Sequence, residues 1–275
     1  VSNVILENID IKEHGAEGLY VTYSYNNLYI SIRCWNNSGT GVYLASANAH
    51  TFIQCSISHN NDVGAILAGY CNSIGFYECE FEENLYQAIL VGGDSNANTF
   101  ESNYIYNNPY GIQIEGYEGL KSRNNRITNN LIANCTNFCI IVNHAVKTVI
   151  DNNWLYDSEN GVWVRANSED TTIENNYFES IASEKISVEA GGTETHIIRG
   201  NKGYVTENGG TATFSISSSV TFAHGLAGTP TGVWCSFNNT DYGSWTWTAN
   251  NTHITLTVTT ANYNGTAYWK AEYKP

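Results

Sequence analysis

The sequence predicts an all-β protein, a solenoid of about eight stacked rungs followed by a small β-sandwich. Three observations support this prediction. A short apolar motif recurs about every 23 residues through roughly the first two hundred residues. The composition favours strands and tight turns over helices, with 19 Tyr, 7 Trp and 24 Gly against 3 Pro and no Met in 275 residues. Beyond about residue 203 the repeat stops and short alternating strands replace it.

The repeated motif is a usually small residue, an apolar residue, any residue and a second apolar residue. It begins at Gly18, Gly41, Gly64, Ala88, Gly111, Cys139, Gly161 and Lys185, with successive spacings of 23, 23, 24, 23, 28, 22 and 24 residues. Two inward positions that flank one outward position have the period of a β-strand. The motif therefore predicts one strand in every rung.

A second strand is predicted before each motif. Its inward pairs are Ile9/Ile11, Ile32/Cys34, Cys55/Ile57, Cys79/Phe81, Asn103/Ile105, Asn130/Ile132, Asn153/Leu155 and Asn176/Phe178. The Asn residues predict a column of buried amides that hydrogen-bond from rung to rung. Cys55 and Cys79 occupy the same column and predict a small apolar stack, the alternative being a disulfide between adjacent rungs. Eight rungs of about 4.8 Å give a column near 40 Å long.

On these Asn-x-apolar and Gly-apolar-x-apolar elements, residues 3 to about 203 resemble the right-handed parallel β-helix repeats of pectate-lyase-like proteins. The resemblance implies the fold and leaves the activity open, because lyases, hydrolases, epimerases, viral tailspikes and adhesins share this solenoid. The chain lacks the Asp pair with Gly-His-Gly of polygalacturonases, the Arg-x-Pro-x-x-Arg of pectate lyases and the Asp-Pro-His-Asp of mannuronan epimerases. These three specific activities are therefore disfavoured.

The C-terminal region predicts a separate β-sandwich, with the domains divided as 1–205 and 206–275. Its six strands are expected at 211–216, 220–224, 232–237, 244–247, 253–258 and 266–273. Segments 220–231 and 268–273 resemble small domains that follow β-helices and fibres in phage tail proteins and in archaeal or viral surface proteins. The resemblance implies a cap on the open solenoid edge and a homotrimer.

Charge and cysteine content exclude several classes of partner and site. The formal charge is −14, from 12 Lys+Arg and 26 Asp+Glu, so a nucleic-acid partner is not expected. No apolar run approaches the roughly 20 residues of a membrane-spanning helix. Seven cysteines without a Cys-x-x-Cys pair predict neither a closed disulfide framework nor a structural zinc site.

Candidate catalytic residues lie on the outward side of the motif strand, in the column four residues after each motif start. This column is bland in the first four rungs and polar in the last four, where it holds Glu115, Asn143, Arg165 and Glu189. Asp94 and His144 stand at its edge. The candidate cluster for chemistry on an oligosaccharide is Asp94, Glu115, His144, Arg165 and Glu189.

Three interpretations of this cluster remain open. In a hydrolase, Asp94 and Glu115 on adjacent rungs would approach to about 5 Å, the carboxyl separation of a retaining glycosidase. In a lyase, Arg165 would neutralise a uronate carboxylate or act as the base, and His144 would move the proton. In the third interpretation the cluster is solvated surface, and Arg165 forms an ion pair with Glu189 on the next rung.

Three outward aromatic residues, Tyr20, Tyr43 and Trp163, are candidate carbohydrate-binding residues because aromatic faces stack on sugar rings. Contact between subunits explains them equally well. Segments 92–96 and 167–170 carry oxygen ligands suited to Ca²⁺ but lack the spacing of a known calcium loop, so ordinary polar turns are favoured. No metal or cofactor is predicted.

Together these features favour an extracellular or virion-surface protein that recognises a polysaccharide or cell-surface glycan, in the manner of a tailspike or adhesin. Whether it is an enzyme stays open; if so, a polysaccharide lyase or a glycoside hydrolase is expected. The alternative is a structural fibre or envelope subunit without catalytic activity, since no known catalytic motif is present.

Overall fold

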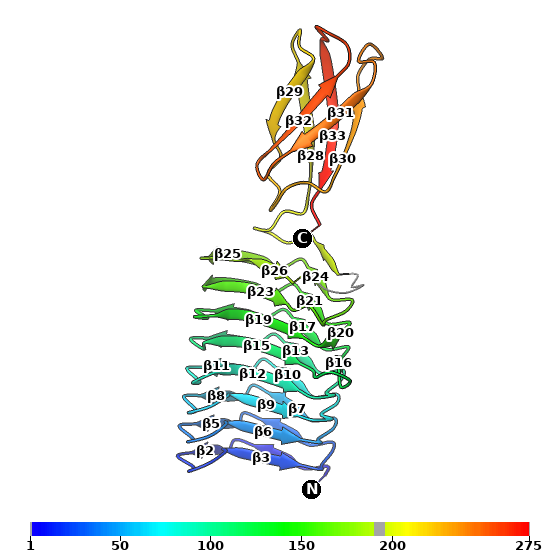
Figure 1. The fold of residues 1–275 in the computed structure, drawn as a ribbon. Coiled ribbons are helices and arrows are strands. Elements are labelled where there is room, and N and C mark those ends of the chain that lie inside the picture. The colour runs from blue at the N-terminus through cyan, green and yellow to red at the C-terminus, as the bar shows by residue number, and fades with distance from the viewer. Residues whose placement is uncertain (1, 190–195, 275) are drawn as a thin grey trace. The chain divides into compact units, whose positions relative to one another are not determined.

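The computed structural model describes residues 2–189 and 196–274, and the chain divides into two compact units, 1–197 and 198–275. The first unit is a parallel β-solenoid and the second consists of two small antiparallel sheets (Figure 1). No helix occurs among the described residues. The all-β fold class, with about eight rungs followed by a sandwich, is therefore confirmed.

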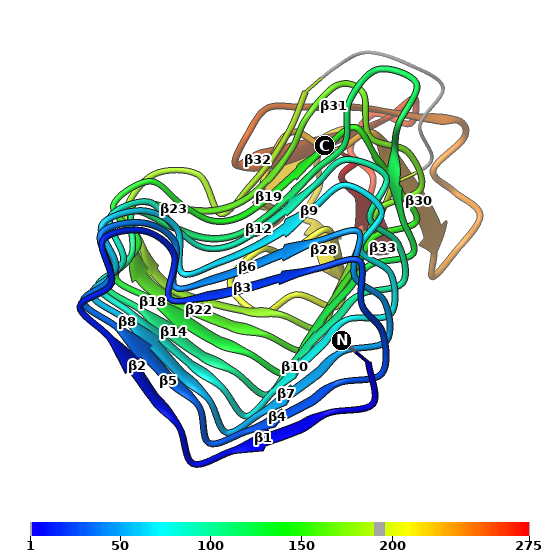
Figure 2. The ribbon, with the colours of Figure 1, turned by 90° about the horizontal axis from the view of Figure 1, so that it is seen from below.

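Each rung contains three strands, one more than the sequence predicted. Three parallel sheets run along the solenoid, and Figure 2 shows the strands of each sheet lying one behind another. Sheet A contains β1 (Ile5–Glu7), β4 (Leu28–Ile30), β7 (Thr51–Ile53), β10 (Gly75–Tyr77), β13 (Thr99–Glu101), β17 (Arg126–Thr128), β21 (Val149–Asp151), β24 (Thr172–Glu174) and β27 (Ile197–Arg199). Sheet B contains β2 (Asp10–Lys12), β5 (Arg33–Trp35), β8 (Ser56–Ser58), β11 (Glu80–Glu82), β14 (Tyr104–Tyr106), β18 (Leu131–Ala133), β22 (Trp154–Ser158) and β25 (Tyr177–Ile181).

Sheet C is built from the repeated motif. Its strands are β3 (Leu19–Thr22), β6 (Val42–Ala45), β9 (Ala65–Ala68), β12 (Gln87–Gly92), β15 (Tyr110–Glu115), β19 (Phe138–Asn143), β23 (Asn160–Val164) and β26 (Ile186–Val188). Equivalent residues pair in register, as in Leu19 with Val42 and Ile112 with Ile140. Rungs are numbered here from one to eight, starting at the N-terminal end. The two apolar columns of the motif face the interior, as predicted.

Sheet A was not predicted from the sequence. Its nine strands have three residues each, but six of the eight sheet B strands are equally short, and the inward residues of sheet A recur at the rung spacing. Its inward column holds an aromatic stack. The ring centroids are 4.3 Å apart between Tyr29 and Phe52, 4.5 Å between Phe52 and Phe76, and 6.1 Å between Phe76 and Phe100. These side chains are among the largest that are fully buried, so the missed sheet supplies much of the core.

The predicted asparagine column is confirmed at the corner between sheets A and B. The Nδ2 of Asn103 donates to Asn130 Oδ1 at 2.9 Å, Asn130 donates to Asn153 at 3.0 Å, and Asn153 donates to Asn176 at 2.9 Å. The backbone N–H of Cys79 donates to Asn103 Oδ1, which continues the column by one rung. All seven cysteines are free thiols, so Cys55 and Cys79 stack without a disulfide.

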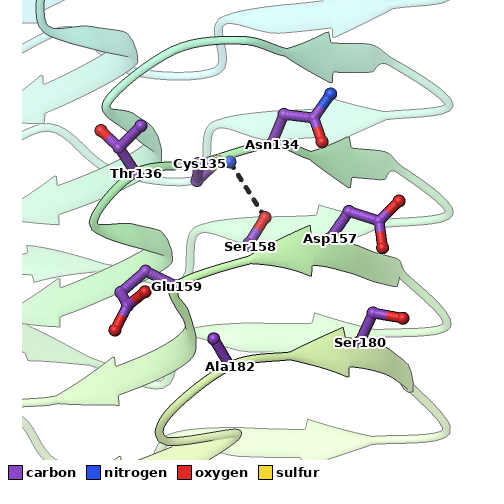
Figure 3. A pocket seen from close by; sticks show the side chains of 8 residues that line it. All are labelled: Asn134, Cys135, Thr136, Asp157, Ser158, Glu159, Ser180 and Ala182. Carbon is purple, nitrogen blue, oxygen red and sulfur yellow. Dashed lines mark hydrogen bonds between the residues drawn. The ribbon is translucent and has the colours of Figure 1, made fainter.

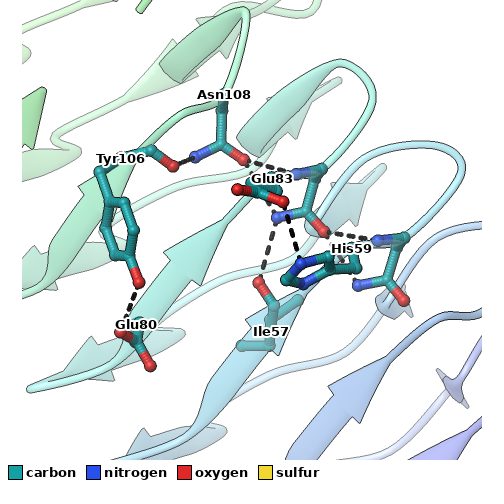
Figure 4. A network of polar contacts seen from close by, with 8 residues as sticks. Ile57, His59, Glu80, Glu83, Tyr106 and Asn108 are labelled. Carbon is teal, nitrogen blue, oxygen red and sulfur yellow. Dashed lines mark hydrogen bonds and ion pairs between the residues drawn. The ribbon is translucent and has the colours of Figure 1, made fainter. Parts of the chain in front are cut away.

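A second asparagine column, not predicted from the sequence, lies at the corner between sheets B and C. Asn37 donates to Asn60 at 2.9 Å, Asn60 to Asn84 at 2.9 Å, and Asn84 to Asn108 at 3.1 Å (Figure 4 shows part of this network). A Cβ on Gly41 would lie 2.6 Å from the Asn60 Nδ2. The small residue at the motif start therefore makes room for this column.

The 28-residue spacing between the fifth and sixth motifs reflects an insertion. After β15 the chain forms a small hairpin in which Tyr117 and Leu120 exchange backbone hydrogen bonds of 3.1 and 2.9 Å. The short strands β16 (Ser122–Arg123) and β20 (Ala145–Val146) then pair beside sheet C. The added residues lie outside the three-sheet column, so the stacking of the rungs is preserved.

The second unit contains six antiparallel strands near the predicted positions. They are β28 (Glu207–Phe214), β29 (Ser219–Ala223), β30 (Gly232–Phe237), β31 (Trp245–Ala249), β32 (His253–Val258) and β33 (Gly265–Glu272), in the orders β28-β33-β30 and β29-β32-β31. Phe214, Ile254, Leu256 and Trp269 belong to one buried apolar cluster. The two sheets enclose a core of their own, which is typical of a β-sandwich.

Candidate functional site

The candidate residues predicted from the sequence all lie on the strands of sheet C or in the one or two residues directly after them. In rungs one and two, Tyr20 and Tyr43 stack with ring centroids 5.3 Å apart and planes within 10°. The Tyr20 side chain is 58% exposed, so it keeps a surface for a ligand. Burial, and then the neighbouring phenol of Tyr20, raise the pKa of Tyr43, so its hydroxyl stays protonated at neutral pH.

Trp163, on β23 in rung seven, belongs to a different group on the same face. Its ring stacks on Phe138 at 5.0 Å, and the guanidinium of Arg165 lies 4.8 Å from its centroid. Arg165 Nε is 3.8 Å from Glu189 Oε1, with 42% and 37% of these side chains exposed. Solvent screening at this exposure leaves such a pair little net stability, so a ligand anion would compete for Arg165 at small cost.

Glu115 and His144 are connected through an amide. Asn143 Nδ2 donates to Glu115 Oε1 at 3.2 Å, and His144 Nδ1 is 3.1 Å from Asn143 Oδ1. Because Oδ1 only accepts, this contact requires a proton on Nδ1 of His144. Gln113 donates to the other oxygen of Glu115, so the carboxylate is held from both sides.

Asp94 lies apart from these groups in the turn after β12. Its Oδ1 accepts a hydrogen bond of 2.8 Å from Asn96 Nδ2. Among the described residues, no hydrogen bond or ion pair joins Asp94 to another candidate. The predicted cluster therefore divides into Asp94 alone, Glu115 with His144, and Arg165 with Glu189, and the last pair lies beside Trp163.

A second surface, on the outer face of sheet B, was missed by sequence reasoning. It carries five aromatic rings in rungs five, seven and eight: Tyr104, Tyr106, Trp154, Tyr156 and Tyr177. The signal was present in the sequence, because 103–106 and 153–156 both read Asn, aromatic, apolar, aromatic. In each segment the apolar residue between the two rings points inward and was assigned to the core. The two rings beside it point outward, and their outward positions were not considered.

A cleft of about 410 Å³ lies where these strands turn toward sheet C. Figure 3 shows two walls, with Asn134, Asp157 and Ser180 on one side and Thr136, Glu159 and Ala182 on the other. On the floor, the N–H of Cys135 donates to Ser158 Oγ at 3.0 Å. Two carboxylates of a single rung, Asp157 and Glu159, thus stand on opposite walls.

Neither a metal site nor a membrane-spanning helix is found among the described residues. No group of three or more His, Cys, Asp or Glu residues in 2–189 and 196–274 is placed to hold a metal ion. The same part of the chain contains no helix long and apolar enough to cross a membrane. The polar turns at 92–96 and 167–170 belong to this part of the chain, and neither contains a group of side chains placed to hold a metal ion.

The right handed beta helix region family matches residues 1–127 and 69–260 of the sequence. The chain belongs to this family. The match agrees with the three parallel sheets, the in-register inward columns and the asparagine columns described above. The resemblance drawn from the Asn-x-apolar and Gly-apolar-x-apolar elements is therefore confirmed, and this family member continues into a second, antiparallel unit.

Several solved structures share the fold. The A-module of mannuronan C-5 epimerase AlgE4 from Azotobacter vinelandii is 13% identical, with a TM-score of 0.63 over 72% of this chain and 58% of its own. ORF18 of Geobacillus virus E2 is 14% identical, with a TM-score of 0.61 over 97% and 57%. Pectate lyase Pel9A is 15% identical, with a TM-score of 0.54 over 66% and 51%. No curated protein sequence matches the chain.

These likenesses establish the fold alone, because the identities are low. The chain spans roughly half the length of the three structures, between 51% and 58%. The likeness to the viral ORF18 extends over 97% of the chain and so includes the antiparallel unit. Any activity therefore depends on the side chains on the surface of this β-helix.

Proposed function

We propose that this protein recognises a polysaccharide along the outer face of sheet C, at a cell or virion surface or as a secreted protein. The observation that carries the proposal is the Trp163 group, in which an exposed cation lies over an aromatic ring beside an exchangeable carboxylate. The carboxylate of an acidic sugar can displace Glu189 from Arg165, while the indole of Trp163 holds the guanidinium in place. The stacked Tyr20 and Tyr43 extend the same face toward rung one.

The fold supports this proposal by analogy. Two structures with the same fold are, by name, a mannuronan C-5 epimerase and a pectate lyase. Both names refer to polymers of acidic sugars, which agrees with the role assigned to Arg165. We further propose that three copies associate as a homotrimer, because closed cyclic symmetry would cover long faces of the solenoid.

Glu115 and His144 are the groups on this face that would move a proton if the bound glycan is also cleaved. The competing function, a fibre or envelope subunit without activity, has its own support. Glu115 is already held by Gln113 and Asn143, and Glu189 by Arg165 and the N–H of Ala166. Carboxylates held in this way are also what a structural surface would contain.

Binding of polygalacturonate and alginate, measured by calorimetry, tests the proposal. Trp163→Ala and Arg165→Ala should each weaken binding by about 3- to 30-fold, because each removes one stacking or charge contact. Tyr23→Ala is the matched control, since this tyrosine is 80% exposed in the turn after β3 and off the sheet face. Equal binding by all four proteins would refute the sheet C site.

Cleavage is scored separately in the same samples. Glu115→Gln should abolish hydrolysis while leaving binding nearly intact, because an amide can neither ionise nor donate an acidic proton. Loss of lyase activity in Arg165→Ala alone would instead favour the lyase interpretation. Absence of binding and cleavage, together with ordered polymers by electron microscopy, would favour the structural subunit.

A further inference from the structure

The outer face of sheet B carries an organised aromatic surface, here called the sheet B platform: Tyr104, Tyr106, Trp154, Tyr156 and Tyr177. Trp154 stacks on Tyr177 with centroids 5.8 Å apart and planes within 15°, and it contacts Tyr156 at 5.2 Å. Tyr104 contacts Tyr106 at 4.7 Å. Tyr104 and Trp154 are each 42% exposed, so both keep ring surface open to a ligand.

The platform is continuous although rung six contributes no ring. Leu131 lies in register between Tyr104 and Trp154, and Ala133 lies between Tyr106 and Tyr156. Ala133 occupies an outward position and is nevertheless 0% exposed, which means that its neighbours close over it. The rings thus form one surface from rung five to rung eight, roughly 14 Å at about 4.8 Å per rung.

Polar contacts hold the rings in place. Tyr106 donates its hydroxyl to Glu80 at 2.9 Å (Figure 4). Burial, followed by hydrogen bonds with Glu82 and Glu80, raises the pKa of Tyr106. Burial and then a hydrogen bond with Tyr104 raise the pKa of Tyr156. These rings are ordered before any ligand binds, which lowers the entropy cost of binding.

The charge around the platform has one sign. Sheet B and its bordering turns in rungs four to eight comprise residues 78–83, 102–107, 129–134, 152–157 and 175–180, and these segments contain no Lys or Arg. They contain six carboxylates: Glu78, Glu80, Glu82, Glu83, Asp157 and Glu179. An acidic polymer would be repelled here, whereas sugar hydroxyls could donate to these carboxylates.

The cleft continues the platform at the sheet edge. Tyr156 is followed directly by Asp157, and Glu179 by Ser180, so the platform strands run into one cleft wall. Within the described residues, no hydrogen bond reaches the carboxylates of Asp157 and Glu159. Acceptors with open lone pairs beside aromatic faces match the two sides of a pyranose ring, which carries hydroxyls at its edge and C–H groups on its face.

We infer that the sheet B platform and the adjoining cleft bind an uncharged glycan chain, at a site separate from the acidic-glycan site proposed on sheet C. The two sites share no residue. They also differ in charge, because Arg165 serves the first and only carboxylates surround the second. The inference therefore stands or fails independently of the sheet C site, although both describe glycan recognition by the solenoid.

The test is native electrophoresis of the full chain through gels that contain one polysaccharide each. The uncharged probes are mixed-linkage β-glucan, xyloglucan, galactomannan and dextran, and the charged probe is polygalacturonate. At least one uncharged polymer should retard the protein, and Trp154→Ala and Tyr104→Ala should each weaken that retardation by about 10-fold. Removal of outward rings leaves the inward columns intact, and circular dichroism checks that each variant is folded.

Trp35→Ala is the matched control on the same sheet face in rung two. Trp35 donates to Asp10 at 2.6 Å and has Lys12 at 4.9 Å and Arg33 at 5.6 Å from its ring, so its faces are occupied. This variant should be retarded as strongly as the parent. Trp163→Ala, run in parallel, should be retarded by the uncharged polymer as strongly as the parent, and less strongly than the parent by polygalacturonate.

Three outcomes would overturn the inference. The first is the absence of retardation by all four uncharged polymers. The second is equal retardation of the parent, Trp154→Ala and Tyr104→Ala. The third is a mass by light scattering that falls in Trp154→Ala while no glycan binds, which would make the platform an interface between copies of the chain. Loss of polygalacturonate binding in Trp163→Ala alone would concern only the proposal for sheet C and would leave the sheet B inference unchanged.

Discussion

The solenoid and the sandwich differ in how many polar side chains they bury. The solenoid interior contains whole columns of asparagine, including Asn103, Asn130, Asn153 and Asn176 at 0–2% exposure. In the sandwich, His224 is the one buried polar side chain among residues 207–274, and the rest of its core is apolar or aromatic. His224 accepts from the N–H of Leu226 and contacts the Asn250 carbonyl oxygen, so it packs inside a turn.

The difference follows from symmetry. Parallel in-register rungs place a copy of each side chain about 4.8 Å above and below it, so that an amide can donate to one neighbour and accept from the other. Antiparallel strands provide no such repeated neighbour, and a lone buried amide would remain unpaired. A polar core is therefore stable where the repeat itself supplies the partner. Three predictions test this comparison, in order of decreasing effect.

Removing the sandwich tests whether its role is assembly or capping. If the sandwich holds the subunits together, we expect deletion of residues 206–275 to convert a trimer into single chains, so that the number of chains per particle in light scattering falls from three to one. A trimeric truncated protein would instead limit the sandwich to a cap. A monomeric full-length chain would contradict the proposed homotrimer itself.

Breaking a column tests the symmetry argument directly. Asn130→Ala removes the acceptor of the Asn103 backbone N–H and of one of the two Nδ2 hydrogens of Asn103, while the other Nδ2 hydrogen keeps its bond to the Phe76 carbonyl oxygen. The free energy of unfolding should fall by roughly 2–4 kcal/mol in urea titrations. Asn61→Ala is the control, because Asn61 is exposed in a solenoid turn and should change stability by less than about 0.5 kcal/mol. Similar losses in both variants would contradict a special role for the column.

Introducing charge into a column should have the smallest effect. His50 follows Asn27 at the corner before sheet A, where Nδ1 accepts from the Asn27 N–H at 3.3 Å and Nε2 is 3.1 Å from Ser24 Oγ. Burial lowers the pKa of His50, and the hydrogen bonds of the ring with the backbone of Ser24 and Asn27 only partly oppose this shift. The unfolded chain then binds the proton more tightly than the folded one. The stability contribution of neutral His50 is therefore full above about pH 6.5 and declines as pH falls below it.

His50→Asn should remove this slope while keeping an acceptor for Asn27. Unfolding of the parent and the variant is compared in urea between pH 7.5 and 5.5, where most carboxylates remain ionised. The parent should lose stability relative to the variant by less than about 1.4 kcal/mol per pH unit. Parallel pH profiles would show that His50 does not titrate in this range.

The inward columns could be predicted because each repeats eight times with the same spacing. The asparagine column of Asn103 and the six strands of the sandwich were predicted for the same reason, from chemistry and alternation that are local in the sequence. Sheet A was missed although its inward residues Tyr29, Phe52 and Phe76 recur at the rung spacing, so its signal was present in the sequence. The second column escaped because Asn37, Asn60 and Asn84 lie in turns, where asparagine is common for other reasons.

For the candidate site, the sequence placed six of the eight candidate residues on the outward side of the sheet C strands, and Asp94 and His144 at the edge. It could not decide which of them touch. Rung spacing puts Glu115 and Asp94 on neighbouring rungs, yet the side chain of Asp94 bonds within its own turn and Glu115 bonds to Asn143. Side-chain partners depend on rotamers and turn geometry, which a repeat does not encode.

The sequence by itself determined that the protein is a β-solenoid with a separate sandwich, and which columns face inward, because burial of a repeated apolar pattern has only one efficient solution. The tertiary structure decided what the outward columns form. Tyr104 and Trp154 lie 50 residues apart in the chain, and only the stacking of rungs brings them with Tyr156 over the small Ala133 into one surface. Contacts between rungs are long-range, so their chemistry is settled only when the column is complete.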